Sequence, residues 1–340
     1  MSKIWSRSIR KLRNQFRSLH HSDRSTDMDG QSTSDGRTTS FPTTIRGFGY
    51  DFNEDGKLRK LDQSGKPTDV PYDFNVSSDH TYNQRRYEAL GELVTEHIYV
   101  LLEKEGLKKL PVPKDIPEED ASFIYCTEGA FEKENLFLLI HGSGVVRVGQ
   151  WARSLIINES IDSGSMLPFI RKARELGFGV VCFNTNENHR LVNGKKSLIE
   201  GSESPEEHAI SVWKDYIQSS RAANIAVVGH SYGGVVIFNL ISHFEQDFMK
   251  RVFVIALTDS VHYQFSSSHL PSSLQNRIFQ ISRNWVKSTE PLDTPIRDSA
   301  DFKDITRVSA GTPKHEMTSW SCMKSLFNFV MQRLPMDSKE

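Results

Sequence analysis

The sequence predicts an α/β fold, in which a mostly parallel β-sheet carries helices on both of its faces. The first observation is a set of short apolar runs from residue 135 onward, which cover residues 135–144, 177–184, 224–231 and 251–259. The second is helical spacing between these runs, over residues 166–176, 205–219 and 233–243. The third is a weaker continuation of the same alternation, with strands near 283–288 and 305–310 and a closing helix over 317–333.

The composition of the chain indicates a globular protein. The chain has 340 residues, 37% of them hydrophobic, and a net charge of −1, which is typical of a globular protein with polar segments. A charge this small gives no general attraction to nucleic acid or to a membrane surface. The three cysteines, Cys126, Cys182 and Cys322, are far apart, which predicts neither a disulfide framework nor a metal site and favours a reducing compartment. We expect no metal and no cofactor.

Residues 1–44 differ from the rest of the chain. Between residues 3 and 19 they carry only basic charges, and five apolar residues recur at helical spacing: Trp5, Ile9, Leu12, Phe16 and Leu19. Such a stripe fits weak contact with a membrane or a partner, a mitochondrial import signal, or a disordered tail with a chance pattern. Residues 23–41 are rich in Ser, Thr, Asp and Gly, which predicts a disordered linker.

Residues 45–128 predict a small N-terminal α/β extension. Residues 48–62 alternate between apolar and polar side chains, and a helix follows, with its apolar positions at Tyr87, Leu90, Val94, Ile98 and Leu101 and its end near Gly106. The part from 129 to 336 is then the main α/β domain.

One stretch of the extension resembles a calcium loop. Asp51, Asn53, Asp55 and Gly56 match the first half of such a loop, but its twelfth position would be Asp62 instead of the usual glutamate. A hairpin turn at Asp55-Gly56 explains the same residues, because glycine accepts the positive φ that the turn requires. We therefore interpret the stretch as a turn.

The strongest motif is Gly229-His230-Ser231-Tyr232-Gly233, which matches Gly-x-Ser-x-Gly between a predicted strand and a predicted helix. In that context the serine sits on a sharp turn above the sheet, and the glycines remove side chains that would clash there. The motif predicts an α/β-hydrolase-like fold with Ser231 as the nucleophile. The simpler alternative is a tight turn in which serine is present for its small size.

A second motif predicts the donors that would stabilise an oxyanion. His141-Gly142-Ser143-Gly144 ends the first strong strand of the main domain, where hydrolases of this type carry one donor. The amides of Gly142 or Ser143, together with that of Tyr232, would hold the developing negative charge. An ordinary glycine turn is the alternative.

The catalytic base is expected near the end of the chain, because the order in this fold is serine, acid, histidine. His315 lies between the last predicted strand and the last helix. The acid stays open between Asp259, at a strand end, and Glu290, in the stretch "STEPLD" that also contains Asp293. Either acid would orient His315 and stabilise its charged form.

Beyond these motifs, long blocks of the sequence resemble the Argonaute-binding (Arb-two) domain family. The blocks are "LIHGSGVVRVGQWARSLIINESIDSGSMLPFI", "ESPEEHAISVW", "HSYGG", "ALTDSVH", "STEPLDT" and "RVSAGTPKHEMTSW". The resemblance runs from about Phe48 to about Val330. It implies an α/β-hydrolase-like fold, with Ser231 at the position of the family's proposed nucleophile, and roles in alternative splicing, RNA silencing and chromatin complexes through Argonaute-type partners.

Two functions follow from these observations. The first is a cotranscriptional regulator or scaffold, in the nucleus and cytoplasm, that binds Argonaute-type proteins and chromatin or splicing factors and retains residual hydrolase chemistry. The second is an active serine esterase or amidase with a Ser-His-acid triad. Direct nucleic-acid binding is less favoured, because basic and aromatic residues do not gather on any predicted element after residue 20.

Overall fold

The structure, a computed structural model, describes residues 40–262, 270–297 and 305–335 of the chain. The basic stripe of residues 3–19 therefore lies outside the described residues. Within the described part no helix is both long and apolar enough to cross a membrane.

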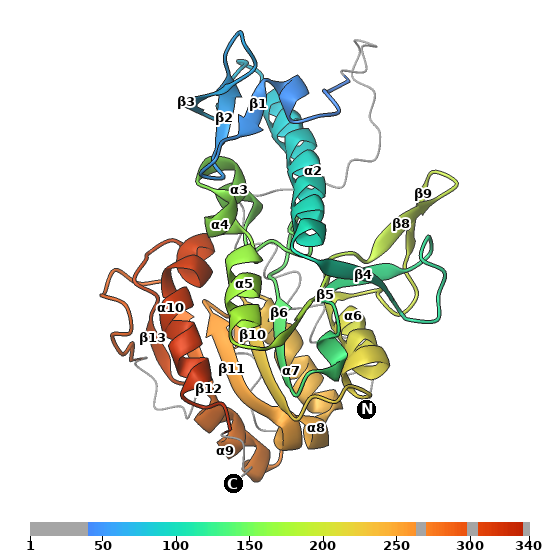
Figure 1. Cartoon of the computed structure of the whole chain (residues 1–340), viewed down its shortest axis with the longest axis vertical. Coiled ribbons are helices and arrows are strands. Elements are labelled where there is room, and N and C mark those ends of the chain that lie inside the picture. The colour runs from blue at the N-terminus through green and yellow to red at the C-terminus, as the bar shows by residue number, and fades with distance from the viewer. Residues whose placement is uncertain (1–39, 263–269, 298–304, 336–340) are drawn as a thin grey trace. The chain divides into compact units, whose positions relative to one another are not determined.

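An eight-stranded sheet forms the centre of the fold (Figure 1). Its strands, in spatial order, are β13 (Arg307–Ser309), β12 (Ser282–Val286), β11 (Val252–Thr258), β10 (Asn224–His230), β6 (Asn135–Ile140), β7 (Gly179–Cys182), β5 (Ser122–Thr127) and β4 (Leu107–Val112). The six strands from β13 to β7 are parallel to one another. β5 runs antiparallel to both β7 and β4. The mostly parallel sheet is thus confirmed.

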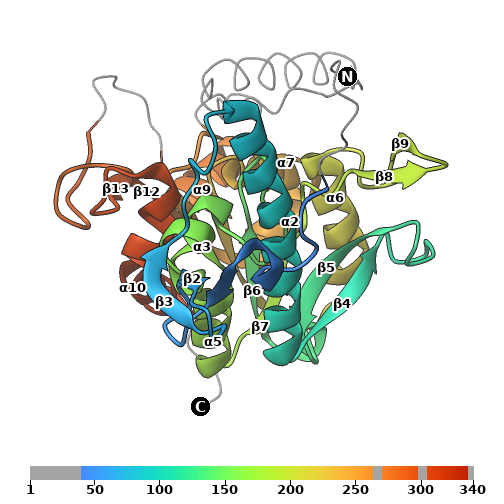
Figure 2. The same cartoon turned by 90° about the horizontal axis from the view of Figure 1, so that it is seen from above.

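Helices cover both faces of this sheet, as expected (Figures 1 and 2). One face packs against α2 (His80–Lys104), α3 (Arg153–Asn158), α4 (Ile161–Gly164), α5 (Leu167–Glu175) and α10 (Thr318–Met331). The other packs against α6 (Pro205–Val212), α7 (Gly233–His243), α8 (Glu245–Arg251) and α9 (Ser272–Ile281), with the π-helical turn Trp213–Ile217 continuing α6. The central strands are buried on both sides because each face meets a helical layer.

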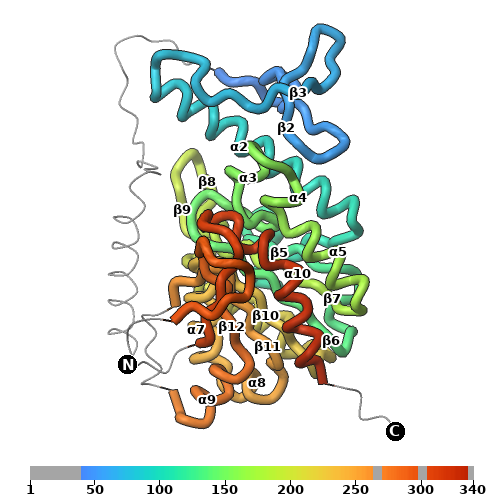
Figure 3. Tube along the Cα trace, turned by 90° about the vertical axis from the view of Figure 1, so that its left-hand side faces the viewer, coloured from blue at the N-terminus to red at the C-terminus, as the bar shows by residue number. Residues whose placement is uncertain are grey.

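A separate antiparallel sheet precedes α2 and lies beyond α3 and α4 (Figure 3). It contains β1 (Tyr50–Phe52), β2 (Leu58–Leu61) and β3 (Pro67–Pro71). The turn between β1 and β2 holds Gly56 at φ 68°, and the side chain of Asn53 accepts a hydrogen bond from the Lys57 amide. The interpretation of this stretch as a hairpin turn accounts for both observations.

Helix α2 begins and ends where capping chemistry places it. The Asp79 side chain accepts hydrogen bonds from the amides of Thr81 and Tyr82, and Gly106 follows the helix with φ 81°. Its apolar face, which includes Leu90, Val94, Ile98 and Leu102, is fully buried.

Two features were not expected from the sequence. Residues 107–127, assigned to the N-terminal extension, form β4 and β5 of the main sheet, while the division of the chain at residue 129 stays a prediction. A two-stranded hairpin, β8 (His189–Val192) and β9 (Lys195–Leu198), also lies between β7 and α6 in the chain and projects from the molecule (Figure 1). Its apolar residues Leu191 and Leu198 are exposed, so the hairpin has no buried face that would give its sequence an alternating apolar pattern.

Candidate functional site

Ser231 occupies the turn between β10 and α7, with φ 52°. A positive φ is costly for a residue with a side chain, and such strain persists only where the surrounding structure enforces it. Here the Ser231 amide donates to the Thr258 carbonyl at 3.0 Å, and the Ser231 carbonyl accepts from Gly234 at 3.2 Å and from Val261 at 3.4 Å. The backbone geometry is that of a nucleophile elbow.

The glycines around Ser231 are required by close contacts. A Cβ on Gly233 would lie 2.5 Å from the Ile140 carbonyl oxygen, and one on Gly234 would lie 1.8 Å from Ser260 Oγ. A Cβ on Gly229 would lie 2.6 Å from Ile237 Cδ1. The helix therefore approaches the strands too closely for any side chain, which explains the glycine spacing in the motif.

His315 and Asp259 form a close pair. His315 Nδ1 lies 2.6 Å from Asp259 Oδ2, a distance typical of a charge-assisted hydrogen bond. Asp259 directly follows β11 at φ 43°, its amide donates to the Trp285 carbonyl, and its Oδ1 accepts from the Lys287 amide. Backbone contacts with β12 and the residue that follows it thus fix the carboxylate that faces His315.

The environment of Asp259 favours its charged form. Burial by itself would raise the pKa of the Asp259 carboxyl, but the hydrogen bond from His315, the His315 charge and the Lys287 amide together lower this pKa below its usual value. A carboxylate that stays ionised can hold the His315 ring in one tautomer and stabilise its charged form.

The other two acids have different surroundings. Glu290 is exposed, and it makes its hydrogen bonds through its main chain: its amide donates to Ser288 Oγ and its carbonyl accepts from Ser309 Oγ. Asp293 accepts hydrogen bonds from the Trp285 indole and the Ser325 hydroxyl, which makes it an anchor between β12 and α10. Of the acids considered, Asp259 is the one that the structure brings to His315.

His230 links this pair to the elbow. Its ring centroid lies 4.8 Å from that of His315, and its Nδ1 lies 3.1 Å from Thr258 Oγ1. Because His230 immediately precedes Ser231, His315 lies at the same edge of the sheet as the serine. The sequence motif contains His230 but does not predict its contact with His315.

Three buried histidines surround the carboxyl ends of the central strands. Burial lowers the pKa of His230 to about 3, of His208 to about 3 and of His141 to about 4, and the nearby His315 charge adds to the effect at His230. All three are neutral at pH 7. His208 Nε2 accepts a hydrogen bond from the Asn184 amide at 3.1 Å, just after β7.

The expected oxyanion segment lies beside the serine. A Cβ on Gly142 would be 3.0 Å from Ser231 Cβ, so this glycine permits close approach to the elbow. The Gly142 carbonyl accepts from Asn186 Nδ2 at 3.0 Å and lies 2.8 Å from His141 Nδ1, while Ser143 is exposed. Tyr232 is buried at the start of α7. The roles of Gly142, Ser143 and Tyr232 as oxyanion donors stay predictions.

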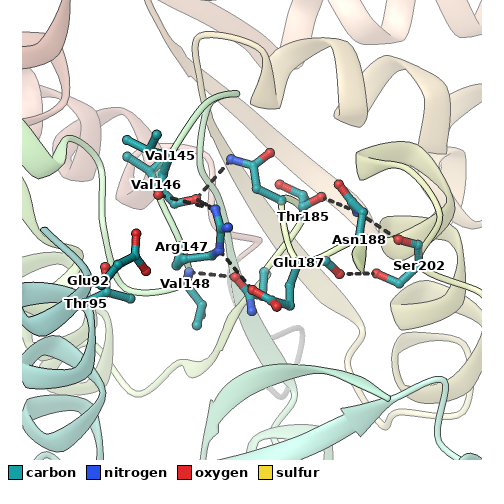
Figure 4. A network of polar contacts seen from close by, with 12 residues as sticks. Glu92, Thr95, Val145, Val146, Arg147, Val148, Thr185, Glu187, Asn188 and Ser202 are labelled. Carbon is teal, nitrogen blue, oxygen red and sulfur yellow. Dashed lines mark hydrogen bonds and ion pairs between the residues drawn. The ribbon is translucent and has the colours of Figure 1, made fainter. Parts of the chain in front are cut away.

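A network of polar contacts holds the loop after Gly142 in place (Figure 4). Arg147 Nε donates to Glu187 at 2.9 Å, the Val148 amide donates to Asn184 Oδ1 at 2.9 Å, and Asn188 Nδ2 donates to the carbonyls of Thr185 and Ser202. The segment after β7 thereby fixes the loop that borders Ser231. In the described part of the chain, no group of three or more His, Cys, Asp or Glu residues could hold a metal ion.

Comparison with known proteins places this geometry in a family. The model of the Arb2 domain matches residues 41–292. The chain belongs to the Arb2 domain family. It is 39% identical to the cotranscriptional regulator ARB2A of Homo sapiens, over 90% of this chain and 84% of the human protein. It is also 39% identical to the ARB2A homolog of Gallus gallus, over 91% and 85% of the two chains.

Among solved structures, this member of the Arb2 domain family is similar to a histone deacetylase from Saccharomyces cerevisiae, with a TM-score of 0.47. The two are 15% identical, and the similarity covers 72% of this chain and 98% of the other. The α/β-hydrolase-like fold follows from the sheet itself: parallel strands, crossover helices on both faces, and a serine elbow between β10 and α7. The predicted fold class and family are therefore confirmed.

Proposed function

We propose that this protein is a cotranscriptional regulator that acts through protein partners, namely Argonaute-type proteins and chromatin or splicing factors, in the nucleus and cytoplasm. The observation that carries the proposal is its relation, over about nine tenths of the chain, to proteins named cotranscriptional regulators. The match extends far beyond the residues around Ser231, which supports a role that involves more of the molecule than that site.

Immunoprecipitation tests this function. The tagged protein is recovered from nuclear extract and probed for Argonaute proteins and splicing factors, beside an unrelated α/β-hydrolase carrying the same tag. We expect Argonaute to be enriched with this chain and with Ser231→Ala, because a scaffold role does not need the hydroxyl. Recovery of neither class of protein would contradict the proposal.

A second function, serine ester or amide hydrolysis, is favoured by one specific observation: the Asp259–His315 pair beside a strained serine elbow. In this reaction the Ser231 hydroxyl would attack a carbonyl carbon while His315 takes its proton. His315 would then return the proton to the leaving group, and water would release the acyl group by the same steps. The amides of Tyr232 and Gly142 would stabilise the oxyanion.

A fluorophosphonate probe tests the hydrolase function directly, because it reacts covalently with activated serines. We expect the wild-type protein to be labelled and Ser231→Ala to remain unlabelled. Equal labelling of both proteins, or labelling of neither, would remove the case for a working nucleophile at position 231.

A further inference from the structure

Glu206 is a buried acid that none of the roles above uses. It lies in the first turn of α6 with 6% of its surface exposed, whereas its neighbour Glu207 faces solvent. The Tyr232 hydroxyl donates to Glu206 Oε1 at 2.6 Å. A distance this short is typical of a hydrogen bond to an ionised carboxylate.

The position of Glu206 is at the same edge of the sheet as the serine. Tyr232, its partner, directly follows Ser231 and is the residue immediately before α7. Two residues beyond Glu206 on α6, His208 contacts the Asn184 amide at the end of β7. Helix α6 also packs against α7. The first turn of α6 therefore lies at the carboxyl ends of β7 and β10.

The hydrogen bonding of Glu206 is incomplete. In the described part of the chain its carboxylate accepts one hydrogen bond, from Tyr232, and forms no ion pair with Lys, Arg or His. A carboxylate can accept about four hydrogen bonds, and burying one without a cation or further donors is expensive. Glu206 Oε2 is not among the fully enclosed atoms that lack a partner, so it keeps access to solvent or to a ligand.

We propose that Glu206 determines ligand specificity at the Ser231 site by binding a cationic group, a guanidinium or a primary ammonium. The ligand would place its cation on Glu206 Oε2 and its carbonyl carbon at Ser231. This inference deepens the hydrolase proposal and rests on its site, but the cation-binding part does not need the serine to be reactive. Arginine or lysine side chains of a peptide and small free cations share this chemistry.

A pair of esters tests the inference in the reaction. p-Nitrophenyl 4-guanidinobenzoate carries the cation, and p-nitrophenyl 4-ureidobenzoate is a neutral ester of similar shape. We expect the acylation rate to favour the guanidino ester, and Glu206→Gln to reduce this ratio about tenfold or more, because a hydrogen bond to a charged group is lost. The glutamine still accepts from Tyr232, so the fold is preserved.

Glu207→Gln is the matched control, since it removes the same charge one residue away on the exposed side. We expect it to keep the wild-type ratio. An unchanged ratio in Glu206→Gln, or an equal loss in both variants, would overturn the inference.

A binding measurement separates this inference from the hydrolase proposal. Calorimetric titration of Ser231→Ala with phenylguanidine and phenylurea should show tighter binding of phenylguanidine, and this difference should vanish when Glu206→Gln is added. Agmatine and an arginine-containing tripeptide amide, titrated in the same way, distinguish a free cation from a peptide side chain. Absence of phenylguanidine binding would overturn the inference. Binding that depends on Glu206, without acylation by any ester, would overturn only the hydrolase proposal.

Discussion

Asp259 contacts Nδ1 of His315, so in the proposed hydrolysis Nε2 would be the ring atom that exchanges a proton with the serine. Replacing Asp259 by asparagine keeps the size of the side chain but removes the charge and changes the favoured tautomer. We expect Asp259→Asn to slow fluorophosphonate labelling of Ser231 by at least about 100-fold. Labelling rates measured over time in a gel check this.

Glu290→Gln is the control for that experiment. Glu290 is exposed, and within the described residues its hydrogen bonds to Ser288 and Ser309 use its main chain, so we expect labelling at the wild-type rate. If Glu290→Gln slowed labelling and Asp259→Asn did not, the assignment of the acid would be wrong.

The buried histidines give a second prediction, on pH and stability. The pKa of His208 is about 3 in the folded protein and about 6.5 in an unfolded chain, so the unfolded state binds more protons below pH 6.5. The contribution of His208 to the free energy of unfolding is therefore fully present above pH 6.5 and decreases as the pH falls toward 4. For His208 this slope is about 1.4 kcal/mol per pH unit between about pH 6 and its folded-state pKa of about 3, and it vanishes below that pKa.

Urea unfolding between pH 7.5 and 5 measures this slope. We expect His208→Gln to be less stable than wild type at pH 7.5 but to lose stability less steeply on acidification, because one protonation site has been removed. Parallel curves for the two proteins would show that His208 is not the source of the pH dependence.

At the scale of elements, the strand β10, the elbow and helix α7 act as one unit. Gly233→Ala would bring a methyl group against the backbone oxygen atoms of Ile140 and His141, which cannot move without disturbing β6. We expect this variant to lose about 1–3 kcal/mol or more in free energy of unfolding. Thermal denaturation measures the loss, and a Tm equal to that of wild type would contradict the contact.

The elbow could be predicted from sequence because its causes are local. Glycine spacing, an apolar strand before Ser231 and an apolar helix after it all lie within about twenty residues. The same holds for α5, α7 and α10, whose bounds are close to those that their periodicity predicts. The prediction of His315 as the base rests on the chain order of the fold class, and the structure places this histidine beside Asp259.

The acid partner could not be chosen from sequence. Asp259 and Glu290 both follow strands, and the choice depends on backbone contacts of Asp259 with β12 that no local pattern encodes. Strands β4 and β5 were missed for a related reason: "LKKLPV" carries two lysines and a proline, which an edge strand tolerates but which weaken its apolar signal. Glu206 lies in the block "ESPEEHAISVW", but its contact with Tyr232 joins residues 26 positions apart, which no local pattern encodes.

At the scale of the whole molecule, one apolar core joins the N-terminal extension to the main sheet. The same cluster contains Tyr50 and Leu58 of the small sheet, Leu90 of α2, and Phe137 and Val180 of the main sheet. The extension is therefore not expected to unfold independently of the main sheet.

A cavity in α2 tests this cooperativity. Leu90 is fully buried, so Leu90→Ala should cost about 2–5 kcal/mol, and fluorescence and circular dichroism should report the same single transition at lower urea concentration. Val100→Ala, on the exposed side of the same helix, should cost far less. Two separate transitions in Leu90→Ala would show that the extension unfolds alone.

The clamp at the base of the β8–β9 hairpin has a practical consequence. Asn188 bonds to the carbonyls of Thr185 and Ser202, so the two ends of the hairpin are held together independently of what lies between them. A longer turn at the tip, Asn193-Gly194, is therefore not expected to move the loop that borders Ser231. Residues inserted at that tip, including a fluorescent or affinity tag, would leave the enzyme-like edge of the molecule undisturbed.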